Sequence, residues 1–509
     1  MDEKTKYQID SDENSDYMYG IIERILTGVG SRAPCSEAER KAAMLVEDEL
    51  GKHCDEVQIE EFTCYPKAFL GWIRLVVGLI IISCALFFFL IQVQPVVFSL
   101  VCIGLILFAF LLFYKQFFKY EEWTPKFLPY QKRTSQNVVG IIKPQGRVKK
   151  RIIFSGHLDS AYRFNLIHYT GAGHVLFLVS GILALVEYLV IYIAQLLFGI
   201  FGAVSLKTVI VIDIGVVLLS WLLPLLILLL KGNSNLFFGI FRNMEKKTKM
   251  ILLLVLSYAV SVTFILIPYM SSPGNFALKR TLVLVFCLNL PALIALFFFA
   301  SSKAIPGAVD NLSAVAPAMA VAKVLKDWKE HNPEKVPQNT EVVIAIVGCE
   351  EVGLRGSEAF ARRHAREYND IDTTVVNMES ISDTGLVKIY SKEKTTGTSL
   401  SPEVYNLLKE CAGDLKINHV VEPMPGIAGG TDAAGFVRGG LKASSLCGLR
   451  YYDYLNYYHT DRDNLNIIKP YRMPWSHCGV DWTDYNVRGA MEQVLCICLR
   501  YLEKKDAGQ

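Results

Sequence analysis

The chain has 509 residues, a formal net charge of +3, 52% hydrophobic residues and a mean hydropathy of +0.31. Only 20% of the residues are charged, which excludes a disordered chain and a nucleic-acid-binding chain. A positive mean hydropathy is more than one soluble globule usually carries, so segments that cross a membrane are expected.

Residues 1–66 have the polar, mixed character of a soluble α/β domain. Hydrophobic periodicity predicts helices over Tyr19–Gly28 and Ser36–Lys52 and a strand over Val57–Thr63. Met1–Tyr19 is acidic and polar and has no apolar core, so we expect no signal peptide.

Residues 67–117 contain two long apolar runs, Phe69–Val93 and Val96–Tyr114, with the polar pair Gln94 and Pro95 between them. A helix of about 20 residues crosses a hydrocarbon core of about 30 Å. We therefore expect a transmembrane hairpin of two helices here.

Residues 118–172 return to polar sequence. Two short β-rich runs, Asn137–Ile142 and Arg151–Ser155, are predicted to pair as a hairpin because turn residues separate them. His157 and Asp159 follow the second run directly.

Residues 173–302 hold a second apolar group, predicted as a bundle of four transmembrane helices. The four runs are Val175–Ile200, Thr208–Leu230, Met250–Met270 and Thr281–Ala300. Long buried helices of a soluble protein are the alternative, but such helices rarely stay uncharged over these lengths. Glu187 and Asp213 are exceptions, and ionisable groups at membrane depth usually face a bundle interior or a cavity.

Residues 303–509 alternate β-rich and helical runs. The predicted strands are Glu341–Val347, Thr373–Val376 and Ala443–Cys447, and the predicted helices are Ser313–Lys329 and Ser357–Glu367. This alternation predicts an α/β fold with a mixed, largely parallel sheet covered by helices. Residues 1–66, 118–172 and 303–509 are then three parts of one catalytic domain.

Metal-ligating residue types gather where the predicted strands end, which is where open α/β sheets place their ligand sites. The candidates are His157, Asp159, Asp310, Glu350, Glu351, Glu379 and His459. Each is weak evidence alone, since a histidine or a glutamate pair after a strand is usually a solvated loop feature. Together, imidazole and carboxylate groups suit Zn²⁺. Asp159 is spaced to orient the second ring nitrogen of His157.

The ordered motif set resembles that of the M28 family of zinc peptidases. It comprises His157-x-Asp159, Gly307-Ala308-x-Asp310-Asn311, Glu350-Glu351, Glu379 and His459, supported by Gly30-Ser31-Arg32-Ala33-Pro34, Asn137-Val138-Val139-Gly140 and Gly430-Thr431-Asp432-Ala433. The resemblance covers nearly all of the polar sequence.

The resemblance implies an aminopeptidase that hydrolyses peptide bonds with a hydroxide held between two zinc ions. His157 and Glu379 would bind one zinc, Glu351 and His459 the other, and Asp310 both. Glu350 would be the general base and Asp159 would orient His157. Glu379 stands where the family often has aspartate, which leaves the number of metal ions open. Tyr451, Tyr452 or Tyr454 could donate to the developing oxyanion, because they precede His459. We favour the alternative that these tyrosines are ordinary packing residues.

Two alternatives stay open: a glutaminyl-cyclase-like acyltransferase with one zinc, and a membrane receptor or transporter with a vestigial site. Retention of the whole ligand set favours an enzyme. The expected partners are a peptide substrate, either soluble or associated with the membrane, and the lipid bilayer, with no nucleic acid.

Both apolar groups interrupt the catalytic domain, so the site can close only if each group crosses the membrane an even number of times. Short-loop charges then predict a multi-pass protein with a cytoplasmic catalytic domain. The side of the N-terminus carries Lys115, Lys119, Lys231, Arg242, Lys246, Lys247, Lys249 and Lys303, and the opposite side carries Lys207, Lys279 and Arg280. Twelve cysteines without regular spacing agree with a reducing compartment without proving it.

Overall fold

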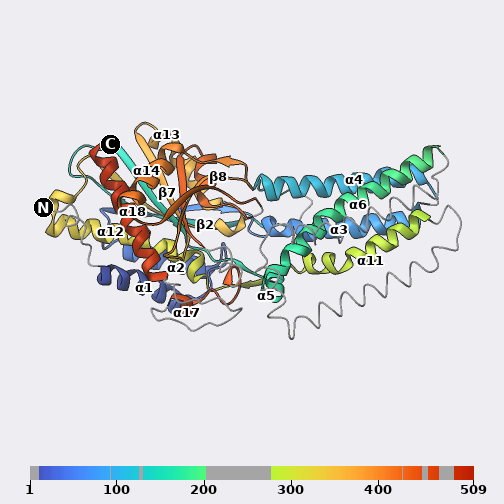
Figure 1. The fold of residues 1–509 in the computed structure, drawn as a ribbon, viewed down its shortest axis with the longest axis horizontal. Helices are drawn as coiled ribbons and strands as arrows, with labels where there is room; N and C mark the ends of the chain where they lie inside the picture. The colour runs from blue at the N-terminus through green and yellow to red at the C-terminus, as the bar shows by residue number, and fades with distance from the viewer. Residues whose placement is uncertain are drawn as a thin grey trace.

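The structure is a computed structural model that describes residues 11–91, 93–124, 130–201, 277–426, 428–449, 457–468 and 487–508. Figure 1 shows two parts, a sheet covered by helices and a group of long helices that extends away from it. The predicted runs Thr208–Leu230 and Met250–Met270 lie outside the described residues, so the predicted count of six membrane helices stays a prediction.

The central sheet has the strand order β1-β2-β6-β3-β7-β11-β8-β10, with β9 paired to β8. Its strands are β1 (Glu56–Cys64), β2 (Arg133–Ile142), β3 (Lys150–His157), β6 (Thr340–Val347), β7 (Asp372–Ile381), β8 (Val387–Glu393), β9 (Thr398–Ser399), β10 (His419–Met424) and β11 (Lys442–Gly448). The β6-β3-β7-β11 core is parallel, whereas β1, β2 and the β8–β11 pair add antiparallel contacts. The predicted mixed, largely parallel α/β fold is confirmed.

The predicted hairpin of β2 and β3 is wrong. β6 lies between them, pairing antiparallel with β2 and parallel with β3. All eight residues of β6 are buried, from Thr340 to Val347. β6 is apolar from Val342 to Val347, and such a strand is stabilised most in the centre of a sheet, where both of its faces are covered.

Helices cover both faces of the sheet, and the side chains of the central strands alternate between them. One face packs on α1 (Ser11–Gly28), α2 (Glu37–Leu50), α12 (Ser313–His331), α14 (Pro402–Asp414) and α18 (Val487–Ala507), and the other packs on α13 (Arg355–Tyr368) and α15 (Asp432–Arg438). Ile152 and Phe154 of β3 face the first group, whereas Ile153 faces the second. This period of two is the one expected of strands between two helical layers.

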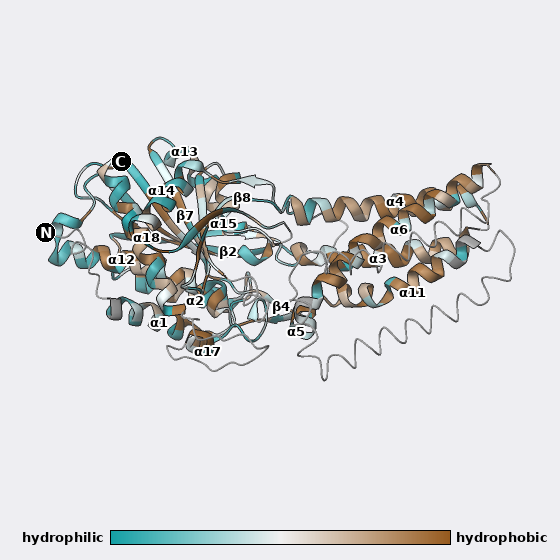
Figure 2. Cartoon of the chain, in the orientation of Figure 1, coloured by the Kyte–Doolittle hydropathy of each residue, from teal (hydrophilic) through white to brown (hydrophobic). Residues whose placement is uncertain are grey.

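The long helices are α3 (Ala68–Leu90), α4 (Pro95–Phe113), α6 (His174–Phe201) and α11 (Ala277–Phe297). They pack on one another through a separate apolar cluster. Figure 2 shows them as a predominantly hydrophobic group beside the sheet. Their outer surface is also apolar, since side chains such as Phe89 (72% exposed) and Phe201 (77% exposed) lie open to the surroundings.

Four helices of the described chain are long and apolar enough to cross a membrane: α3, Pro95–Phe118 (α4 and its continuation), α6 and Ala308–His331. The last contains α12, and 94% of its most apolar 18-residue stretch is buried inside the protein. We therefore assign α12 to the core of the sheet part. α11 contains a shorter apolar stretch, Thr281–Phe297.

Both excursions into the long helices begin and end at neighbouring points. Cys64 at the end of β1 pairs with Arg133 at the start of β2, so the chain returns beside the place where it left. Between the sheet and α6 lie β4 (Tyr162–Phe164) and α5 (Asn165–Thr170), and β5 (Ala300–Ala304) follows α11. β4 pairs antiparallel with β5, which brings the second excursion back in the same way.

Candidate active site

The candidate ligands come together because three neighbouring parallel strands end at one edge of the sheet. His157 is the last residue of β3, Glu350 and Glu351 follow β6, and Glu379 lies near the end of β7. This is the edge at which α/β sheets place ligand sites. Asp310 joins them from the turn before α12, and His459 from the loop after β11.

Asp310 stands between the two histidines. One carboxylate oxygen, Oδ1, is 3.3 Å from His157 Nε2, and the other, Oδ2, is 3.2 Å from His459 Nε2. Each histidine has a second carboxylate beside it. Glu379 Oε1 is 3.5 Å from His157 Nε2, and Glu351 Oε2 is 3.2 Å from His459 Nε2.

Glu350 lies beside the same cluster, with its Oε2 atom 3.8 Å from His157 Nε2. The structure thus brings together all seven residues selected from the sequence. Tyr451, Tyr452 and Tyr454 lie outside the described residues.

Asp159 contacts His157, as expected, and also the glutamate pair. His157 Nδ1 is 3.1 Å from the backbone oxygen of Asp159 and 3.4 Å from its carboxylate. The carboxylate accepts hydrogen bonds from the backbone N–H groups of Glu350 and Glu351, at 3.0 and 3.1 Å. Asp159 therefore orients His157 mainly through its backbone, and its side chain holds the glutamate pair.

The electrostatics of the cluster are those of buried carboxylates that lack enough positive charge. Burial raises the pKa of Glu350 and of Glu379, and it raises the pKa of Glu351 to about 7 although His459 opposes the shift. Burial lowers the pKa of His157, but the Glu350 and Glu379 carboxylates outweigh it and raise that pKa well above its usual value.

His459 and Asp310 show the same imbalance. Burial lowers the pKa of His459, but Glu351 and Asp310 raise it to about 9. Burial raises the pKa of Asp310, but the two imidazoles outweigh it and lower that pKa below its ordinary value. The two imidazoles thus carry too little positive charge to balance the four carboxylates of the cluster, and a bound cation would supply the rest.

The donor set fits zinc. His157, Asp310 and Glu351 each offer a ligand atom, and these atoms lie within 4.8 Å of one another. Three buried donor atoms, His157 Nε2, Glu351 Oε1 and Glu379 Oε2, have no hydrogen-bond partner in the part of the chain that the structure describes. Imidazole nitrogen and carboxylate oxygen are ordinary zinc ligands, and buried charges of this kind are usually paired or bound to a metal.

Two buried residues that hold the site were not selected as functional from the sequence. Asp463 accepts hydrogen bonds from the backbone N–H groups of Val309 and Asp310, at 2.7 and 3.0 Å. The Arg32 guanidinium donates to the backbone oxygens of Gly30, Leu158, Pro306 and Gly307. It therefore ties the loop after His157 to the loop before Asp310.

Gly307 requires the absence of a side chain. Its φ is +65°, and a Cβ atom there would lie 2.5 Å from the backbone oxygen of Asp310 and 2.7 Å from Ser160. Only glycine accepts this conformation and this approach without strain.

A further buried carboxylate, Asp432, lies near the cluster. Burial raises the pKa of Asp432 to about 8, and its charge acts on Glu350. The motif Gly430-Thr431-Asp432-Ala433 supported the family resemblance but was not expected to contribute to the site. The one available signal was that its acidic residue begins a helix, α15, packed against β7 and β11.

The sheet and its histidine–carboxylate cluster define a mixed α/β protein with a site of the metal-binding kind. Residues 298–474 match the family model described as Peptidase family M28. The resemblance predicted from the motifs is confirmed over this segment. Asp310, Glu350, Glu351, Glu379 and His459 lie within the matched segment, whereas His157 and Asp159 precede it.

Solved structures with a similar overall arrangement include two aminopeptidases and a glutaminyl cyclase. A zinc aminopeptidase from Bacillus subtilis is 11% identical, with a TM-score of 0.44 over 96% of this chain and 95% of that one. An aminopeptidase from Aneurinibacillus sp. strain AM-1 is 10% identical, with a TM-score of 0.45 over 96% and 93%. The glutaminyl cyclase of an Acidobacteriales bacterium is 9% identical, with a TM-score of 0.45 over 97% and 96%. None of the curated proteins matches the chain.

Proposed function

We propose that the protein is a membrane-embedded zinc metallopeptidase, and specifically an aminopeptidase. The observation that carries the proposal is the position of Asp310, whose two oxygens face different histidines while each histidine has a carboxylate of its own. Such a symmetrical donor set suits two ions that share one bridging carboxylate.

In this proposal His157 and Glu379 would hold one zinc, Glu351 and His459 the other, and Asp310 would contact both. Zinc bound there would polarise a substrate carbonyl and lower the pKa of a water molecule. Asp159 would fix the backbone of Glu350 and Glu351, and so the direction of both side chains.

Glu350 would act as the general base. Its carboxylate lies 3.8 Å from His157 Nε2, beside the cluster. Asp310 lies closer to both histidines, so Glu350 is left free of the contacts that join them. In this role it would accept a proton from water and then donate it to the leaving amine.

The apolar outer surface of α3, α4, α6 and α11 supports insertion in a bilayer. A soluble protein rarely exposes so continuous an apolar surface, whereas a membrane helix presents apolar side chains to lipid. The excess of short-loop lysines and arginines on the N-terminal side supports a cytoplasmic sheet part. The eleven cysteines of the described residues are all free thiols, which agrees with the reducing cytoplasm.

The membrane helices would also restrict access to the site. Phe164 of β4 donates its N–H to the His459 backbone oxygen at 2.8 Å, and its ring lies 4.3 Å from the imidazole. Arg163 and Lys303, on β4 and β5, both pair with Asp461 at 3.0 and 3.2 Å. This short connection holds the site near the bilayer surface, so peptides at the membrane are the expected substrates.

The decisive experiment combines zinc content with activity against peptides that have free or blocked N-termini. The proposal expects two zinc ions per active site and hydrolysis only of free N-termini. One zinc and release of ammonia from an N-terminal glutamine would instead indicate the cyclase reaction.

The variant Glu350→Gln tests the base. It should retain zinc and lose about 10²–10⁴-fold in kcat, because only the proton acceptor is removed. If Glu350→Gln left the biological activity of the protein intact without any peptide hydrolysis, a receptor or transporter with a vestigial site would be favoured.

A further inference from the structure

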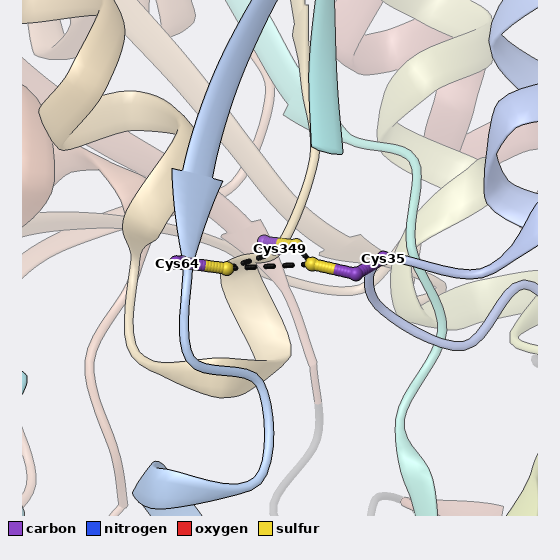
Figure 3. Close-up of side chains that lie close together, drawn as sticks. All are labelled: Cys35, Cys64 and Cys349. Atoms are coloured by element: carbon purple, nitrogen blue, oxygen red, sulfur yellow. Dashed lines mark hydrogen bonds between the residues drawn. The ribbon is translucent and has the colours of Figure 1, made fainter. Parts of the chain in front are cut away.

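A second cluster of metal-ligating side chains lies next to the candidate active site but shares no residue with it. Cys35 Sγ is 3.4 Å from both Cys64 Sγ and Cys349 Sγ, and the remaining Sγ–Sγ distance, between Cys64 and Cys349, is 3.8 Å. Figure 3 shows the three side chains converging from separate segments of the chain. All three are free thiols, and a disulfide would need about 2.0 Å.

From this geometry we infer that Cys35, Cys64 and Cys349 form a structural zinc site, distinct from the histidine–carboxylate cluster. A tetrahedral ion with zinc–sulfur bonds of about 2.3 Å holds its sulfur ligands about 3.8 Å apart, and the observed triangle is close to that size. The inference does not depend on the proposed peptidase reaction.

The surroundings hold the triangle in place before any ion binds. The buried Glu39 carboxylate accepts hydrogen bonds from the backbone N–H groups of Cys35 and Cys349, at 2.7 and 3.1 Å, and from the Ser135 hydroxyl at 2.9 Å. Ser36 caps α2 and accepts from the Glu39 N–H, so the helix start fixes this carboxylate. Because Glu39 is committed to these donors, we expect water to be the fourth ligand.

Two of the three cysteines have a backbone conformation that is unfavourable for cysteine. Cys35 and Cys349 have φ values of 56° and 55°, a left-handed conformation that is unfavourable for a residue with a Cβ atom. Glycine or asparagine would be the easier choice there. A thiol at both positions is therefore explained better by its side chain than by its backbone.

Charge favours a divalent ion over a monovalent one. Three thiolates and Zn²⁺ leave a single net negative charge. The Glu39 carboxylate, whose Oε1 is 3.7 Å from Cys349 Sγ, adds to that charge. The buried Arg355 guanidinium opposes it at Cys64. A Cu⁺ ion would leave more uncompensated charge in the same buried place, at a higher desolvation cost. Each thiol would lose its proton to solvent as its sulfur binds the ion.

The site would brace three segments that matter to the rest of the protein. Cys64 ends β1 just before α3, Cys349 directly precedes Glu350, and Cys35 lies in the loop before α2. An ion bound here would join the start of the first long helix to the loop that carries the glutamate pair.

Cobalt substitution separates this site from the histidine–carboxylate cluster, because only thiolate ligands give an intense sulfur-to-cobalt charge-transfer band. The full-length, reduced, detergent-solubilised protein is stripped of metal and titrated with Co²⁺. We expect the band to reach its full intensity when one Co²⁺ ion per chain is bound by the three cysteines. It should be absent in Cys64→Ser and should disappear when Zn²⁺ displaces the cobalt. Cys411→Ser, which removes a buried cysteine elsewhere, is the matched control and should keep the band.

A second measurement covers the case in which Cys64→Ser does not fold. In the wild-type protein, Zn²⁺ should slow alkylation of Cys35 at least tenfold, whereas Cys54, also half-buried, should react at the same rate with and without zinc. No charge-transfer band in the wild-type protein, a band unchanged in Cys64→Ser, displacement of cobalt by Cu⁺ but not by Zn²⁺, or equal alkylation of Cys35 would each overturn the inference.

Discussion

Asp310 is the residue on which the two halves of the candidate site depend. Its oxygens face His157 and His459 at 3.3 and 3.2 Å. Asp463 holds the backbone N–H of Asp310 in turn. A change at Asp310 should therefore be felt in both halves, whereas a change at one histidine should be felt mainly in one.

We predict that Asp310→Asn removes about two equivalents of zinc, those of the histidine–carboxylate cluster, and that His459→Ala removes about one; zinc at the cysteine triangle should stay in both variants. An amide is a poorer zinc ligand than a carboxylate and carries no charge to offset the ions. Metal analysis of purified protein measures this, with Asp414→Asn as a control far from the cluster. A zinc content of Asp310→Asn equal to that of the wild type would contradict the bridging role.

Arg32 provides a test of how the site loops are held together. Its guanidinium is fully buried and donates to four backbone oxygens. Burial lowers its pKa to about 10, while Asp159 and Asp463 oppose that shift. Removing a buried partner of this kind leaves the remaining polar groups unpaired.

We therefore predict that Arg32→Met destabilises the fold by about 3 kcal/mol or more. Arg40→Met removes an exposed arginine nearby and should change stability little. Thermal unfolding in detergent compares the two variants with the wild type. An equal melting temperature for Arg32→Met and Arg40→Met would refute the bracing role of Arg32.

Most of the candidate ligands were predictable because they follow predicted strands, whereas Asp310, which precedes a helix, and His459, in a loop, were selected as members of the ordered motif set. His157 and Glu379 needed only strand prediction and the rule that ligands gather at carboxyl ends. Arg32 and Asp463 act on backbone groups of loops far away in the sequence. Their hydrogen bonds obey no spacing rule, so their function emerges only from the folded chain.

At the scale of elements, the α1–α2 contact contains a buried carboxylate with two cationic partners. Arg24 of α1 and Lys52 donate to Glu49 at 2.7 and 2.8 Å. Burial raises the pKa of Glu49, but the hydrogen bonds from Lys52 and Arg24 outweigh it and lower that pKa to about 2. The ionised form is thus favoured in the folded protein.

The sign of the pH dependence follows from that lowered pKa. The stabilisation from Glu49 is complete above its ordinary pKa of 4.5 and is lost as the pH falls from there toward about 2. We predict that Glu49→Gln costs roughly 1–2 kcal/mol at neutral pH, since solvent screens the exposed Arg24 and Lys52. The cost should shrink below about pH 4.5.

Thermal unfolding between pH 3 and 7 measures the difference between the wild type and Glu49→Gln, with Glu47→Gln as the control in the same helix. A difference that stays constant over this range would show that Glu49 does not depend on its charge.

Elements with a strong local pattern were predicted well, and their pairing was not. The helix predicted over Ser36–Lys52 is α2, Glu37–Leu50, because a serine cap and an apolar face define it locally. The predicted hairpin was wrong because β6, almost 200 residues beyond β2 in the chain, pairs between its two strands. Sequence proximity favours hairpins, but a buried strand seeks the centre of a sheet.

At the scale of the whole molecule, the chain leaves the sheet twice for the long helices, and each time it must return to the side from which it left. Hydropathy and the order of the motifs alone predict an even number of crossings in each apolar group. The pairings of β1 with β2 and of β4 with β5 return the chain at both places. α3 and α4 form the first excursion, so their connection should lie on the face of the membrane opposite the sheet.

That expectation gives a test of both membrane insertion and orientation. A protease site inserted at the Gln94–Pro95 connection should be cut from outside intact cells, whereas one appended after Gln509 should be protected. The reason is that the N-terminal side carries most of the short-loop lysines and arginines, which favour the cytoplasm. In permeabilised cells both sites should be cut, which controls for access to the site itself. Cleavage of the C-terminal site in intact cells would reverse the orientation. Equal accessibility of both sites would mean that α3 and α4 do not cross the bilayer, because a helical hairpin cannot span it and leave its connection on the side of its ends.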